Sequence, residues 1–127
     1  MTQDIILFVD DEVICHTLAN LAIPAYTKYK LVSAYDGQQA IDLAREHVDN
    51  LALILSDVML PDVNGYEIYN ILRAEDKFKQ IPFIFQSGIA SQGIDLSQYI
   101  KEKVTIIYKP YKQEKLLELV KNVLDTV

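Results

Sequence analysis

Small polar and charged side chains follow four apolar runs of this sequence. Asp10 and Asp11 follow the first run, Asp57 the third, Ser87 the fourth and Lys109 the fifth. Three carboxylates held close together repel one another unless a cation joins them. Mg²⁺ suits such a cluster, because it takes a few carboxylate or carbonyl oxygens and leaves its other positions to water and phosphate oxygens. With a lysine ammonium, these are the parts that phosphoryl transfer to an aspartate requires.

The apolar runs predict five strands that are buried on both faces. The runs are short and rich in β-branched and large apolar residues, which is typical of a parallel sheet covered on both sides. We expect the strands at Ile5–Val9, Leu31–Ala34, Leu51–Ser56, Phe83–Gln86 and Val104–Tyr108. The segments between them carry apolar residues three and four positions apart, which indicates helices.

Five helices are expected, one after each strand. Asp36 and Gly37 suit the start of the second helix, and the loop Pro61–Gly65 precedes the third. Ser91–Lys103 fits helical spacing only loosely and contains Gly93, so a short, weak fourth helix is predicted there. The first helix is expected to bury a stripe made of Cys15, Leu18, Ala19 and Ala22.

This alternation predicts an α/β fold, a flavodoxin-like doubly wound sheet of five parallel strands in the order 2-1-3-4-5. Right-handed crossovers place the carboxyl ends of all the strands on one edge of the sheet. Ligands of such sheets bind beyond those ends, where the strand order reverses. The three carboxylates, the Ser87 hydroxyl and the Lys109 ammonium are therefore expected to converge in one shallow pocket.

The same residues resemble the receiver domains of two-component response regulators. The resemblance rests on Val9–Glu12, on Asp57–Pro61 with Gly65 four residues further on, on Ser87 and on Lys109–Pro110. It covers essentially the whole chain, in the right order and spacing. It implies a phosphoacceptor switch that catalyses its own phosphorylation and, slowly, its own dephosphorylation. It also implies a histidine kinase or phosphotransfer protein as donor, and a downstream protein target that reads the fourth helix and fifth strand.

The resemblance implies a role for each site residue. Asp57 would accept the phosphoryl group, and Lys109 would pair with its oxygens. Ser87 would hydrogen-bond those oxygens and move on activation. The peptide between Lys109 and Pro110 is expected to be cis. The magnesium ligands that it implies are Asp10, mainly through a bound water, Asp11, Asp57 and the backbone carbonyl of Met59.

Composition limits the other function classes. A chain of 127 residues has a common single-domain length, so one receiver domain is expected over residues 1–127. The net charge of −6 disfavours direct binding to nucleic acid or anionic membranes. The single cysteine, the lack of a secretory signal and the lack of a bilayer-length apolar stretch favour the cytoplasm. The chain is interpreted as a free-standing regulator or as a receiver excised from a larger regulator or hybrid kinase.

Ordinary structural explanations stand beside these functional ones. Adjacent acids such as Asp10 and Asp11 commonly lie in a solvated loop or cap a helix. His16 and His47 are expected to be solvated, and neither is proposed as a metal ligand. Cys15 is interpreted as a small core residue and not as a redox sensor.

Three alternative functions are weighed against the receiver. A phosphatase of the haloacid dehalogenase type also uses an aspartyl phosphate, but Met59 occupies the position of its general acid. A flavodoxin would need a phosphate-binding loop after the first strand, where two acids stand instead. A receiver fold kept only for protein contacts is disfavoured by the intact acids and lysine.

The sequence departs from the receiver pattern near the expected output surface. The family usually has an aromatic residue three positions before Lys109, where this chain has Ile106, and an alanine where it has Gly88. Strand alternation places Tyr108 on the same side as Ile106. The departures leave the chemistry intact, and they predict that the switch acts by ordering the segment after Ser87.

Overall fold

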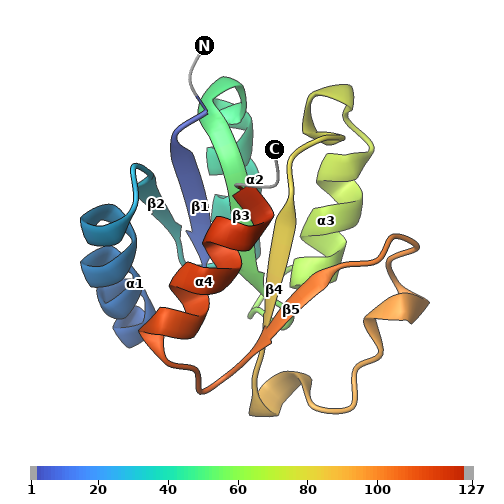
Figure 1. Ribbon diagram of the computed structural model, residues 1–127. Coiled ribbons are helices and arrows are strands. Elements are labelled where there is room, and N and C mark those ends of the chain that lie inside the picture. The colour runs from blue at the N-terminus through green and yellow to red at the C-terminus, as the bar shows by residue number, and fades with distance from the viewer. Residues whose placement is uncertain (1–2, 125–127) are drawn as a thin grey trace.

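Five parallel strands form one sheet in the order β2-β1-β3-β4-β5, as the sequence predicts (Figure 1). This computed structural model describes residues 3–124 of the chain. The strands are β1 (Ile5–Val9), β2 (Lys30–Ala34), β3 (Leu51–Asp57), β4 (Phe83–Ser87) and β5 (Thr105–Tyr108). Each lies within one residue of its expected bounds. The expected burial on both faces holds for β1, β3 and β4, whereas the edge strands β2 and β5 are only partly buried.

In the described part of the chain, four α-helices cover the two faces of the sheet. They are α1 (Val13–Tyr26), α2 (Gly37–Glu46), α3 (Gly65–Arg73) and α4 (Gln113–Leu124). Two apolar clusters show which helix covers which face, since α1 and α4 pack on one side while α2 and α3 pack on the other. As predicted, α2 begins after Asp36, whose carboxylate accepts a hydrogen bond from the Gln39 N–H at 2.7 Å.

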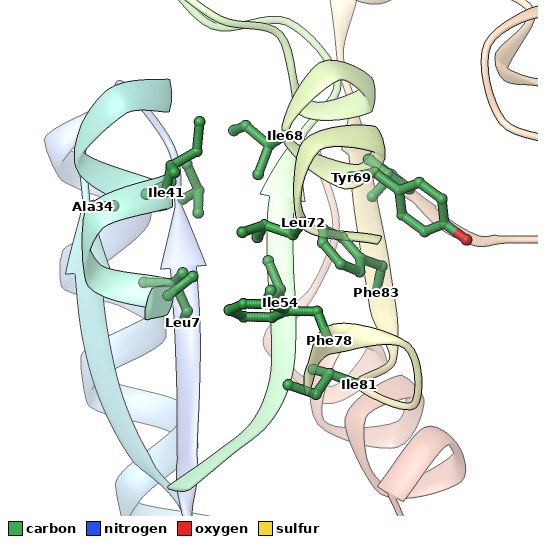
Figure 2. Packing of buried hydrophobic residues seen from close by; sticks show 14 of the residues in the cluster. Leu7, Ala34, Ile41, Ile54, Ile68, Tyr69, Leu72, Phe78, Ile81 and Phe83 are labelled. Carbon is green, nitrogen blue, oxygen red and sulfur yellow. The ribbon is translucent and has the colours of Figure 1, made fainter. Parts of the chain in front are cut away.

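The larger cluster lies between the sheet and α2 with α3 (Figure 2). Leu7 and Ile54 are register partners on β1 and β3, and both are buried there. Ile41 of α2 and Leu72 of α3 lie over them, and Phe78 closes the cluster at the end of α3. This packing fixes β1 and β3 against each other, and therefore fixes the residues that follow them.

The expected fourth helix is not an α-helix. Between β4 and β5 the described chain forms only two 3₁₀ turns, at Ile89–Ser91 and Leu96–Gln98, so the described residues hold four α-helices and not five. Gly93 lies between the turns with a φ of +87°, a left-handed conformation that interrupts a right-handed helix. The Asp95 carboxylate accepts hydrogen bonds from the N–H and hydroxyl of Ser97, which favours a turn over helix propagation. The α4 of this structure is thus the expected fifth helix.

The buried stripe of α1 also differs from the expected one. Leu18 is 42% exposed and Cys15 is half-buried, so the core face lies to one side of the predicted stripe. The buried residues of α1 are His16, Ala19, Ala22 and Ile23. The prediction of a solvated His16 is wrong, because its Nε2 lies 2.7 Å from the backbone oxygen of Asp10 and its ring packs on Phe8 and Tyr35. None of the helices in residues 3–124 is long and apolar enough to cross a membrane.

Candidate functional site at the carboxyl ends of the strands

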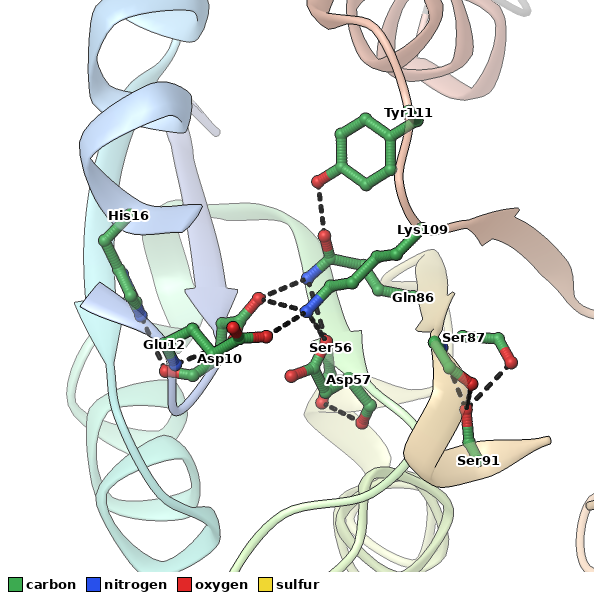
Figure 3. Close-up of polar contacts among 11 residues, drawn as sticks. Asp10, Glu12, His16, Ser56, Asp57, Gln86, Ser87, Ser91, Lys109 and Tyr111 are labelled. Atoms are coloured by element: carbon green, nitrogen blue, oxygen red, sulfur yellow. Dashed lines mark hydrogen bonds and ion pairs between the residues drawn. The ribbon is translucent and has the colours of Figure 1, made fainter. Parts of the chain in front are cut away.

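The polar residues at the strand ends come together at one edge of the sheet (Figure 3). Asp10 directly follows β1, Asp57 ends β3, Ser87 ends β4 and Lys109 directly follows β5. β1, β3, β4 and β5 are neighbours in that order, so these side chains start from adjacent positions. The site is a consequence of parallel strand order, and not of proximity along the chain.

Lys109 links the acids of the two central strands. Its Nζ lies 2.8 Å from Asp10 Oδ2 and 3.0 Å from Asp57 Oδ1, with Glu12 Oε1 at 3.5 Å. Burial by itself lowers the pKa of Lys109, but the hydrogen bonds and charges of the two aspartates outweigh it and raise the pKa. The amine therefore stays protonated and supplies a fixed positive charge between the carboxylates.

The two aspartates ionise differently. Burial and the charge of Asp10 raise the pKa of Asp57 to about 8, although Lys109 opposes the shift. Burial also acts to raise the pKa of Asp10, but hydrogen bonds from Lys109 and the Glu12 N–H lower it overall. A single ammonium therefore offsets the charge of one aspartate and leaves the second costly to ionise.

Asp11 adds a third carboxylate at the surface. Asp10, Asp11 and Asp57 each offer an oxygen, and these oxygens lie within 4.8 Å of one another. Asp11 is exposed whereas the other two are buried, so a cation can reach the cluster from solvent. Carboxylate oxygens are the donors that Mg²⁺ prefers, and the three carboxylates outnumber the single ammonium of Lys109. The residues present can therefore bind a divalent metal.

A cavity of about 530 Å³ opens over these groups. Asp11, Asp57 and Lys109 line its polar part, and Met59 and Ile89 lie among its apolar lining. Such a cavity is large enough for a phosphoryl group and the end of its donor.

Ser87 reaches the same edge but points away from the acids. Its hydroxyl lies 2.8 Å from the Ser91 hydroxyl, which also accepts a hydrogen bond from the Gly88 N–H at 3.0 Å. Among the described residues no hydrogen bond joins Ser87 to Asp57. The peptide between Lys109 and Pro110 is cis, as the resemblance implies.

Gly65 sets the position of the Asp57 backbone. A Cβ atom at Gly65 would lie 2.0 Å from the backbone oxygen of Asp57, so a side chain here would force the two segments apart. The Gly65 N–H also donates to the Val58 oxygen at 2.9 Å. The first turn of α3 is thereby held directly against the end of β3.

Sequence reasoning missed Gln86, which contacts the acids, and Tyr111, which contacts Gln86. Gln86 is buried in β4, and its Nε2 lies 3.3 Å from Asp57 Oδ1 and 3.5 Å from Asp10 Oδ2. The Tyr111 hydroxyl donates a hydrogen bond to Gln86 Oε1. The available signal was a polar residue near the end of an otherwise apolar strand, which is unusual for a buried position.

The fold and the site define a class of signalling protein. The family model for the response regulator receiver domain matches residues 6–121, which is nearly the whole chain. The chain therefore belongs to the receiver domain family of two-component response regulators.

Curated relatives agree with this membership. The polar-differentiation response regulator DivK of Brucella ovis is 30% identical over 124 residues, which cover 98% of each protein. Response regulator Rre1 of Synechocystis is 27% identical over 119 residues, which are 94% of this chain and 51% of Rre1. The chain thus spans about half the length of Rre1.

A solved receiver shows the same fold. The receiver domain of the sensor histidine kinase PA1611 from Pseudomonas aeruginosa has a TM-score of 0.83 to this chain at 24% identity, covering 98% of this chain and all of the other. That structure has a magnesium ion coordinated in its active site cleft.

Proposed function

We propose that this chain is a magnesium-dependent phosphoacceptor in which Asp57 takes a phosphoryl group from a histidine kinase or phosphotransfer protein. The observation that carries the proposal is the Asp57 carboxylate, which borders an open cavity beside two further carboxylates and 3.0 Å from the Lys109 ammonium. A Ser/Thr/Gly-rich phosphate-binding loop after β1 would favour a flavodoxin, but two acids stand there instead. A general acid two residues after Asp57 would favour a phosphatase of the haloacid dehalogenase type, but Met59 stands in that position.

The metal would be held by Asp10, Asp11, Asp57 and the backbone carbonyl of Met59. When bound, it supplies positive charge that offsets the acids and the phosphoryl oxygens. The donor set fits, because the three carboxylates are close together and only one ammonium balances them. The magnesium in the PA1611 receiver, which has the same fold, supports this assignment.

Transfer requires the Asp57 carboxylate to be ionised and aimed at phosphorus. One of its oxygens forms the new O–P bond while the P–N bond of a phosphohistidine breaks, and the imidazole leaves with the electron pair of that bond. Lys109 places its charge where negative charge collects on the transferred group. Ser87 supplies a hydroxyl that can turn from Ser91 toward the phosphoryl oxygens.

The output of the switch is proposed to be a protein contact. Phosphorylation would draw Ser87 away from Ser91 and so change the turn after β4. The surface formed by that turn and β5 would then bind a downstream protein differently in the two states.

Labelling with a small phosphodonor tests the proposal. The wild type incubated with magnesium and acetyl phosphate should gain one phosphoryl group that hydroxylamine removes, as measured by intact mass. Asp57→Asn should gain none, while Asp42→Asn, an exposed aspartate on α2, should be labelled like the wild type. Equal labelling of Asp57→Asn and the wild type would contradict the assignment of Asp57.

A further inference from the structure

We propose that Gln86 is a positioning residue for the Asp57 carboxylate, and that the Tyr111 hydroxyl holds the Gln86 amide in the orientation that this requires. The inference rests on the proposed role of Asp57 as phosphoacceptor. It adds a tyrosine and a glutamine behind the acids, on the side of the site that faces β4 and the loop after β5 (Figure 3).

The sheet itself brings Gln86 to Asp57. The two residues are register partners on the neighbouring parallel strands β4 and β3, so their side chains leave the sheet side by side. Gln86 is 1% exposed and Asp57 is 6% exposed, so both side chains are almost fully shielded from bulk solvent. A contact built from two strand positions in the middle of a sheet is held more rigidly than one built from loops.

The hydrogen bond from Tyr111 decides which end of the Gln86 amide faces the acids. A carboxamide has an oxygen that accepts and a nitrogen that donates, and its orientation follows from its partners. Tyr111 donates to Oε1, and burial raises the pKa of its phenol, so the hydroxyl keeps its proton. The Nε2 group is left facing Asp57 and Asp10, whereas the flipped amide would place an oxygen against two carboxylates.

Gln86 and Lys109 share one oxygen of Asp57. Lys109 Nζ lies 3.0 Å from Oδ1, and Gln86 Nε2 lies 3.3 Å from the same atom. Lys109 has a flexible side chain and is needed by the incoming phosphoryl group, whereas Gln86 is enclosed and anchored at its other end by Tyr111. When Lys109 turns to the phosphoryl group, Gln86 still fixes the plane of the carboxylate. The other oxygen, Oδ2, is then kept directed at the donor, which is a positional contribution to the transfer.

A double-mutant cycle on the transfer rate tests this coupling. Tyr111→Phe removes one hydroxyl and keeps the ring, and Gln86→Met keeps the length of the side chain and removes its hydrogen bonds. Each should slow labelling by acetyl phosphate at saturating magnesium by roughly two- to tenfold, the range expected for one hydrogen bond. In the Gln86→Met background, Tyr111→Phe should have no further effect, because Tyr111 acts through Gln86. Tyr29→Phe, at a half-buried tyrosine just before β2, should leave the rate unchanged.

Two kinetic outcomes would overturn the inference. One is an unchanged rate in Tyr111→Phe. The other is a double mutant whose loss equals the product of the two single losses, since the residues would then act independently. The magnesium dependence of the rate separates positioning from metal binding, because a positioning role lowers the rate at saturation and leaves the half-saturating magnesium concentration within about twofold.

A spectroscopic measurement distinguishes failure of this inference from failure of the proposed function. The side-chain amide resonances of Gln86 should shift in Tyr111→Phe and in Asp57→Asn, and stay in place in Tyr29→Phe, all measured without phosphodonor. If the Gln86 amide resonances do not shift in either Asp57→Asn or Tyr111→Phe, the proposed positioning role of Gln86 is wrong, even where labelling succeeds. If both variants show the shifts but the wild type is not labelled by acetyl phosphate, the result would instead contradict the proposed phosphoacceptor role. If Gln86→Met does not fold, Tyr111→Phe and its spectrum decide the question.

Discussion

Without metal, ionisation of Asp57 carries a high free-energy cost in the folded protein. Burial and the neighbouring charge of Asp10 raise its pKa to about 8, far above the ordinary value of 3.8. Between these two values the folded protein holds a proton that the unfolded chain releases. The stabilising effect of that proton is therefore complete below about pH 4 and is lost as the pH rises toward 8.

Asp57→Asn should remove this pH dependence. The amide cannot ionise, so the variant avoids the cost that the wild type bears at high pH. Without magnesium, the melting temperature of the variant minus that of the wild type should grow by at least about 3 °C between about pH 5 and pH 8.5. Thermal melts in a chelator measure this, and Asp42→Asn, an exposed aspartate, is the matched control. A constant difference across the range would show that the pKa of Asp57 is ordinary in the folded protein.

The lifetime of the aspartyl phosphate should depend on Met59 and Ile89. Both line the cavity beside Asp57, and Ile89 is 89% exposed. Neither side chain can orient or deprotonate a water molecule, so hydrolysis should be slow. Met59→Asn and Ile89→Glu should each speed decay several-fold after the donor is removed, whereas Met59→Leu should not. Decay that is the same in all four proteins would exclude water positioning as the limiting factor.

At the scale of elements, local patterns predicted the strands better than the connections. The strands were found from continuous apolar runs, and the strand-end rule then placed Asp57, Ser87 and Lys109 at one edge without any contact being known. The contact of Gln86 with Asp57 depends on the register of β4 against β3, and its contact with Tyr111 joins residues 25 positions apart. A single-sequence pattern contains neither. The prediction for His16 fails for a different reason, because its partner is the backbone oxygen of Asp10, only six residues away, and residue type alone does not reveal such a partner.

The segment between β4 and β5 shows where helical spacing fails. Leu96 and Ile100 are buried as a helix pattern would suggest, and they pack against the larger cluster. Gly93 and the Asp95 turn nevertheless stop an α-helix from forming across them. Burial of a few apolar side chains is thus compatible with an irregular backbone. The backbone hydrogen bonds of this segment, such as that from the Tyr99 N–H to the Leu96 oxygen, close separate turns and form no continuous helix.

Activation should therefore appear first in residues 88–104. Ser91 ties the start of the segment to Ser87, and that hydrogen bond has to break when Ser87 turns toward a phosphoryl group. The phosphoryl mimic beryllofluoride should raise amide hydrogen-exchange protection in residues 88–104 and leave Gly37–Glu46 of α2 unchanged. Ser91→Ala should shift the beryllofluoride-free protein toward the activated exchange pattern, because the restraint on Ser87 is gone. Protection that changes elsewhere but spares residues 88–104 would refute this account.

Over the whole molecule, the exposed side of α1 lies next to the acid site. Ile14 is 60% exposed and Leu21 is 68% exposed, which leaves apolar surface beyond what the core uses. A groove of α1 and α4 side chains that include Leu18 and Leu117 continues this surface. An apolar face beside the phosphoacceptor is suited to the helices of a phosphodonor protein.

Ile14→Lys should separate protein donors from small donors. Transfer from the cognate phosphodonor protein should fall at least tenfold, because a charge enters the contact, while labelling by acetyl phosphate should be unchanged. The matched control is Ile71→Lys on α3, where the side chain is 40% exposed and does not line the cavity over the acids. Equal transfer to Ile14→Lys and Ile71→Lys would place the donor contact elsewhere, and loss of acetyl phosphate labelling in Ile14→Lys would indicate misfolding.

Magnesium should stabilise the whole domain through the same three acids. A ligand that binds only the folded state at a hundredfold excess over its dissociation constant adds about 2.7 kcal/mol, or about 10 °C in melting temperature for a domain of this size. Asp11→Ala should lose most of this response, because it removes the exposed carboxylate of the cluster. Without metal the same variant should melt no lower than the wild type, since it has also lost a carboxylate that repels the other acids of the cluster. Sodium chloride at matched ionic strength controls for screening of the net charge of −6. A full magnesium response in Asp11→Ala, or a clear loss of its metal-free stability, would show that these carboxylates do not act as one metal site.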